Sequence, residues 1–165
     1  MISRKTDTAF AGWEAETRTT PNNGAVPAIR HVEVTSSPLS VHALEAAVTD
    51  ATVGATVTFN GIVRNHDHGR EVTSLEYEGH PTAQRVLEDV AAELVERFEV
   101  TAIAVAHRIG SIQIGEAALV AVVAASHRGV AFDACAALVD LVKDRIPVWK
   151  HQTFTDGTSE WVNCA

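Results

Sequence analysis

Basic residues stand at both ends of one short stretch of the chain, from Ser126 to Gln152. His127 and Arg128 open it, and Lys143 and Lys150 lie near its end, with apolar residues at helical spacing between them. The N-terminus of a helix offers free backbone N–H groups to an anion, and cations in the last turn meet the negative end of its dipole. The pattern therefore indicates an anion-binding site. Exposed basic residues at two ordinary helix ends are the alternative.

The two lysines are candidates for chemistry as well as for binding. They flank Pro147, which disfavours helix for the residue before it and so ends the helix. Lys150 follows Trp149 directly, in a constrained and partly apolar setting. A lysine that is near other cations or partly desolvated gives up its proton more readily, and can then act as a base or nucleophile. Ordinary surface lysines are the alternative interpretation.

A second polar stretch, Arg64 to Arg70, follows a predicted strand. Arg64 opens this loop, where binding residues are common, although most loop arginines are simply solvated. His66, Asp67 and His68 also lie here, but a metal site needs three or four converging ligands and no second cluster accompanies them. No metal is expected.

Charge and cysteine content exclude several classes of protein. The 13 Lys and Arg residues against 21 Asp and Glu give a net charge of −8, which disfavours a general grip on nucleic acid or anionic membranes. Cys135 falls within the helix pattern and Cys164 near the end, so neither a disulfide framework nor a zinc site is indicated. The N-terminus lacks the apolar core of a signal peptide, and a cytoplasmic protein is expected.

The 165 residues suit a single α+β domain with helices packed on a mixed sheet. Residues 1–28 have no hydrophobic period and are predicted to form a flexible extension, which leaves 29–165 as the domain. Strands are expected at 31–35, 54–63, 72–78, 101–108, 117–125, 152–155 and 160–163, and helices at 40–48, 81–98 and after 126. The apolar run at 117–125 predicts burial on both faces. For the last helix the spacing predicts a buried face of Phe132, Cys135, Ala136, Val139 and Val142.

Three separated motifs resemble one known family. They are GATVTFNGIVRNHDHG from Gly54, HRIGSIQIGE from His107, and ASHRGVAFDACAALVDLVKDRIPVWK from Ala125. In this order they are similar to the large, catalytic subunit of molybdopterin synthase, the MoaE family, over residues 31–162. The resemblance implies an α/β hammerhead-type fold and a homodimer of large subunits, with a small ubiquitin-like sulfur-carrier subunit at each end to complete a heterotetramer.

The implied reaction is sulfur transfer from the C-terminal glycine thiocarboxylate of the carrier to cyclic pyranopterin monophosphate, which forms the dithiolene of molybdopterin. No cofactor is implied, because the partner supplies the sulfur. By motif, the catalytic lysine falls on Lys143 and the second pocket lysine on Lys150. The implied substrate-binding residues are Ile62, Val63, Arg64, His127, Arg128, Lys150, His151 and Gln152.

The chain departs from the family pattern at His151 and Gln152, which replace the usual basic residue and glutamate. Two rival functions stay open. One is a persulfide sulfurtransferase that uses Cys164, and the other is a non-catalytic scaffold that binds the carrier, for which Gln152 is the only hint.

Overall fold

Four strands form a mixed sheet at the centre of the domain. In the computed structural model, which describes residues 28–163, they are β1 (Ile29–Thr35), β2 (Ala55–Ile62), β5 (Ala102–Arg108) and β7 (Ala117–Ala125). The order is β1-β5-β7-β2, with β1 parallel to β5 and the other pairs antiparallel. The predicted extension, apart from Ala28, lies outside the described residues.

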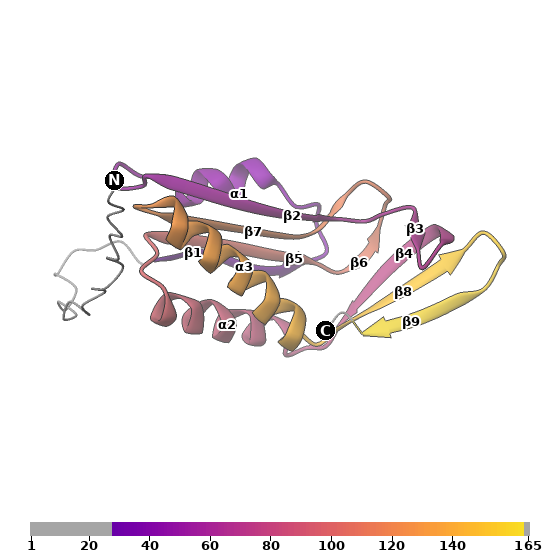
Figure 1. The fold of residues 1–165 in the computed structure, drawn as a ribbon. Helices are drawn as coiled ribbons and strands as arrows, with labels where there is room; N and C mark the ends of the chain where they lie inside the picture. The colour runs from indigo at the N-terminus through magenta and orange to yellow at the C-terminus, as the bar shows by residue number, and fades with distance from the viewer. Residues whose placement is uncertain (1–27, 164–165) are drawn as a thin grey trace, which may run out of the picture.

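A second sheet extends beyond one end of the mixed sheet (Figure 1). Its central strands are β4 (Arg70–Gly79) and β8 (Val148–Phe154), with β3 (His66–Asp67), β6 (Gly110–Ile112) and β9 (Ser159–Asn163) around them. All of its pairs are antiparallel.

Three helices cover the mixed sheet. α1 (Val41–Val48) lies on one face, and α2 (Ala83–Arg97) and α3 (Arg128–Arg145) lie on the other (Figure 1). Ser40 begins α1 as predicted, since its Oγ accepts a hydrogen bond from the Ala43 N–H at 3.2 Å. Within residues 28–163 no helix has both the length and the apolar character needed to cross a membrane.

The two central strands separate two hydrophobic cores. Every residue of β5 is buried, as is all of β7 after Ala117. Alternate side chains point to opposite faces of a strand. Ile103 and Val105 therefore pack with α2 and α3, whereas Ala104 and Val122 pack with α1. The predicted α+β fold with a mixed sheet, and the burial of 117–125 on both faces, are confirmed.

Some local predictions differ from the structure. β3 and β6 were not predicted, and β8 begins at Val148 rather than at Gln152. The predicted inward face of α3 is partly wrong, because Phe132 is 61% exposed and Ala136 is also exposed. Ala131, Ala134 and Leu138 take the buried positions instead. The helix is apolar over most of its circumference. Helical spacing is therefore consistent with a buried face that includes Phe132 and with one that includes Ala131, and the sequence alone does not distinguish them.

Gly54 gives the first testable prediction. A Cβ there would lie 2.2 Å from the Ser126 carbonyl oxygen, which is backbone and cannot swing away. Gly54→Ala should therefore lower the free energy of unfolding by about 1–3 kcal/mol, as overpacking does. Gly129→Ala is the matched control, because its Cβ would meet open space in the first turn of α3. Denaturant unfolding should show the control equal to the wild type or slightly more stable, and equal losses in both would contradict the clash.

Candidate active site

The end of α3 and the start of β8 bring the two lysines together. Ile146 leaves the helix with φ −66° and ψ 122°, and Pro147 follows it. Lys143 lies in the last turn of α3, and Lys150 is the third residue of β8. Ile146 and Val148 are buried, which anchors the short connection to the core. The lysines therefore come from two elements that meet at one firmly packed corner.

Both lysines line a cavity of about 250 Å³. It lies between the ends of β2 and α3, the start of β7, and strands β4, β5, β8 and β9. Phe59, Leu119 and Val142 make part of its wall apolar, while Tyr77 and His107 add polar groups. The chain has three lysines, and both of those in the described residues face this space.

A second, more polar cavity of about 350 Å³ adjoins the first. The two share Ile62, Tyr77 and both lysines as lining residues. Arg64 lies on the wall of the second cavity, so three cations face connected space in an acidic protein. Such an arrangement can accept an anion through charge-assisted hydrogen bonds.

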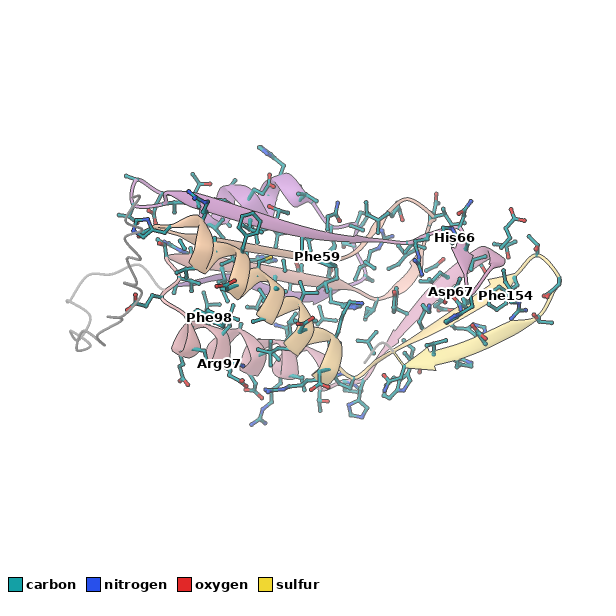
Figure 2. The ribbon with its side chains drawn as sticks, in the orientation of Figure 1. Phe59, His66, Asp67, Arg97, Phe98 and Phe154 are labelled. Carbon is teal, nitrogen blue, oxygen red and sulfur yellow. The ribbon has the colours of Figure 1, made fainter. Side chains whose placement is uncertain are left out.

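Asp67 is the main anion of this polar wall, and it lies beside β8 (Figure 2). Its Oδ2 accepts hydrogen bonds from Lys150 Nζ and from Gln152 Nε2, each at 2.8 Å. Arg64 Nη2 lies 3.4 Å from its Oδ1. The hydrogen bonds from Lys150 and Gln152 lower the pKa of the Asp67 carboxyl to about 2. Asp67 is therefore a carboxylate at neutral pH.

Gln152 is a buried link between strands. It is 1% exposed, and its Nε2 also donates to Glu160 Oε1 at 2.5 Å. One neutral amide thus joins carboxylates from β3 and β9 on either side of β8. Both hydrogen bonds of the Gln152 amide nitrogen therefore go to carboxylates.

His107 presents a neutral imidazole to the cavity. It is 5% exposed, and its Nδ1–H donates to the Arg108 carbonyl oxygen at 2.9 Å. Burial lowers its pKa to about 4, and the charge of Lys143 contributes. The Tyr77 ring meets it edge-on, with 5.4 Å between the ring centroids. Because Nδ1 carries the proton, Nε2 keeps its lone pair and can accept a hydrogen bond.

The structure gathers six of the predicted site residues around the adjoining cavities. They are Ile62, Val63, Arg64, Lys143, Lys150 and Gln152. His151 lines neither cavity and instead stacks on Trp161, with ring centroids 4.5 Å apart.

His127 and Arg128 lie at the opposite end of α3 from Lys143. Lys143 is fifteen positions after Arg128 along the helix, which is about 22 Å at 1.5 Å per residue. The interpretation that one anion site takes in both helix ends is therefore wrong for a single chain.

Asp67, Tyr77 and His107 line the cavities but were not predicted from the sequence as site residues. Asp67 was considered only as a metal ligand, and Tyr77 only as part of a strand. His107 opens one of the three motifs, and that was the one available signal. Within residues 28–163 no group of three or more His, Cys, Asp or Glu side chains is placed to hold a metal ion.

Cys135 packs in the core as predicted, with 4% exposure. Burial raises the pKa of its thiol, which leaves it protonated and unsuited to nucleophilic attack. Cys164 lies outside the described residues.

This fold and site define a small α+β enzyme subunit with a cationic cavity built around two lysines. Residues 34–145 match the family model described as MoaE protein. The chain belongs to the MoaE family.

Known proteins agree with this assignment. A relative from Mycobacterium tuberculosis, named molybdopterin synthase catalytic subunit 1, is 41% identical over 140 residues, which is 84% of this chain and 92% of the relative. The crystal structure of molybdopterin synthase from Staphylococcus aureus matches with a TM-score of 0.75 at 30% identity, over 79% of this chain and 96% of that one. A complex of subunits 1 and 2 of molybdopterin-converting factor from Helicobacter pylori has the same fold, with a TM-score of 0.61 at 18% identity, over 83% and 90% of the two chains.

The depressed pKa of His107 predicts how stability changes with pH. The unfolded chain takes up the proton near the ordinary value of 6.5 and the folded chain only near about 4. The unfolded state thus binds more protons between these values, and the free energy of unfolding should fall as pH drops from about 6.5 toward 4. Chemical denaturation at several pH values should show a shallower slope over this range in His107→Gln. An NMR titration midpoint near 6.5 for His107 would contradict the prediction.

Proposed function

We propose that the cavity is the active site of a molybdopterin synthase, in which sulfur passes from a carrier thiocarboxylate to cyclic pyranopterin monophosphate. The observation that carries the proposal is the convergence of Lys143 and Lys150 on one cavity beside Arg64. Family membership and the names of the relatives support it. The cytoplasmic location expected from the sequence is part of the same proposal.

The two lysines have different surroundings, which favours different roles. Lys150 is half-buried and forms an ion pair with Asp67, so it acts as a fixed cation. Lys143 is exposed at the end of α3 and has no ion pair to any described residue. During transfer the sulfur of the carrier bonds to a carbon of the pterin, and water then adds to the carrier's carbonyl carbon to give an anionic tetrahedral state. Collapse of this state breaks the C–S bond, which leaves the sulfur on the pterin and a carboxylate on the carrier. Lys143 is placed to move a proton there, and both cations stabilise the charge.

Arg64 suits the phosphate of the pterin. Its side chain is 64% exposed and makes only a long contact to Asp67, at 3.4 Å. Its guanidinium is therefore available to a planar, forked contact with phosphate oxygens. The adjoining polar cavity offers the room for that group.

His127 and Arg128 enter the proposal only through a second copy of the chain. At about 22 Å from Lys143 along α3 they cannot reach the same substrate within one protomer. In the proposed homodimer the first turn of α3 from one protomer approaches the cavity of the other. Each cavity then draws its anion-binding groups from two chains.

The carrier docks, in this proposal, on the β8–β9 hairpin beside the cavity. Trp149, Trp161 and Val162 are exposed there, and Val162 also lines the cavity. Apolar side chains of this size are typical of interface cores. The Helicobacter pylori structure is a protein–protein complex of two converting-factor subunits, which supports a partner of this kind. An extended carrier tail then enters between the lysines.

Lys143→Ala should abolish dithiolene formation when the chain is reconstituted with thiocarboxylated carrier and pterin precursor, because the variant lacks the group proposed to transfer the proton. The fold and the carrier complex should survive, since Lys143 is exposed. Arg145→Ala is the control: it removes a cation in the same helical turn that pairs with Glu93 and lines neither cavity. Product assays should show activity only in the control. Turnover by Lys143→Ala at the wild-type rate would overturn the assignment.

Arg64→Ala and Arg128→Ala should each weaken pterin binding by roughly 10- to 150-fold, because a lost charged hydrogen bond is worth about 1.5–3 kcal/mol. Carrier affinity should not change. Titration calorimetry checks both, with the exposed Arg85→Ala on α2 as control.

The same variants test the shared site. At a pterin concentration far below the weakened dissociation constant of Arg128→Ala, where both parents are nearly inactive, mixing Lys143→Ala with Arg128→Ala should restore about one quarter of the wild-type activity, since half of randomly mixed dimers carry one intact site out of two. A mixture no more active than its parents would show that Arg128 does not complete the cavity of a partner.

A further inference from the structure

One carboxylate organises the polar wall of the cavity. Asp67 accepts from Lys150 and Gln152 of β8 through a single oxygen, and its other oxygen faces Arg64 at the end of β2. His68 Nε2 lies 3.9 Å from the same carboxylate but is 89% exposed. Asp67 thus joins the loop after β2 to the strand that bears Lys150. Asp67 has no other place in the proposed chemistry.

The Asp67–Lys150 pair is shielded from solvent. Their side chains are 13% and 19% exposed, whereas Arg64 is 64% exposed. Surface ion pairs contribute little, but removing one partner of a shielded pair leaves an uncompensated charge and frees the other side chain to move. Lysine carries about 2 kcal/mol of rotamer entropy, so an unheld Lys150 would sample many positions.

We propose that Asp67 is a positioning residue, whose carboxylate holds the Lys150 ammonium at the junction of the two cavities, where it binds the anionic substrate. This inference rests on the proposed function and adds a residue to it. Asp67 contacts no reacting atom itself, because Lys150 stands between the carboxylate and the first cavity: Asp67 lines only the second. The pairing also leaves Lys143 as the cavity lysine that has no carboxylate partner in the described part of the chain.

The neutral side chain at position 152 belongs to the same arrangement. Its amide donates to Asp67 and to Glu160, and so separates two carboxylates that would otherwise repel each other. A glutamate there would place three carboxylates together beside one ammonium. Lys150 and Gln152 donate to the same oxygen of Asp67, so a carboxylate at 152 would also lie near the ammonium. The negative charge at position 67 therefore requires a neutral side chain at position 152.

Asp67→Asn tests the proposal in the complete system of full chain, thiocarboxylated carrier and pterin precursor. The amide keeps the shape and loses the charge. The KM for the pterin should rise at least about tenfold, because a freed Lys150 binds the anion less well, and kcat should fall as well, because Lys150 also stabilises the tetrahedral state. Carrier affinity should stay close to that of the wild type, whereas the melting temperature should fall somewhat, because Lys150 is left without its counter-charge. A merely structural role would instead reduce the active fraction, and so lower kcat with KM unchanged.

Asp156→Asn is the matched control. Asp156 also has its pKa lowered to about 2 and pairs with Arg70 at 3.0 Å, but it lies in the β8–β9 turn and lines neither cavity. Its KM and kcat should stay within about twofold of wild type, as for surface substitutions. Equal KM values in Asp67→Asn and Asp156→Asn would overturn the positioning role of Asp67 and leave the proposed function standing. No product from the wild type would overturn the proposed function, and with it any role for Asp67 in that reaction.

A reciprocal exchange gives a second test. Gln152→Glu alone should raise the KM, and Asp67→Asn with Gln152→Glu should bring it back to within about threefold of wild type, since neighbouring substitutions couple. The double variant again has one carboxylate and one amide at these two positions. A double variant no better than Asp67→Asn would overturn the view that Lys150 needs a matched carboxylate here.

Discussion

The corner between α3 and β8 is the constraint on which the site depends. The proline there removes a backbone donor and stops the helix, while its carbonyl oxygen accepts the His80 N–H at 2.9 Å. Ile146 and Val148 on either side are 2% and 0% exposed, so the chain cannot shift without opening the core. A helical side chain and a strand side chain seven positions apart are thereby held on one cavity. All other cavity residues are arranged around this pair.

Local pattern was sufficient for much of the fold. The capping serine, the doubly buried 117–125 strand and the stop at Pro147 follow from short-range rules, and the structure agrees with them. Short strands such as β3 and β6 could not be predicted, because two or three residues show no hydrophobic period. These strands form only because they pair with β4. The buried face of α3 was predicted only in part, because apolar residues occur nearly all round the helix. Packing against the sheet decides which side is buried.

Residues that line the cavities were predictable where residue type and motif coincided, as at Arg64, Lys143 and Lys150. Asp67 was not, because its importance comes from contacts 83 and 85 residues away along the chain. No spacing rule connects a loop to a strand so distant. The separation of His127 and Arg128 from the lysines is the reverse case. Basic residues at both ends of one stretch suggested a single anion site, whereas the length of the helix between them keeps them far apart within a protomer.

The strand order has a consequence for how the cavity comes into being. In both sheets the neighbours are remote in sequence: Ala55 pairs with Ala125, and Gly79 with Val148. Each pairing must close a long loop, and the lost chain entropy is offset only after the strands are in contact. Folding is therefore slow relative to helical domains of similar size. The wall that bears Lys150 needs β4 and β8 side by side. A chain emerging from the ribosome therefore has no cavity until β8 has left the exit tunnel and paired with β4.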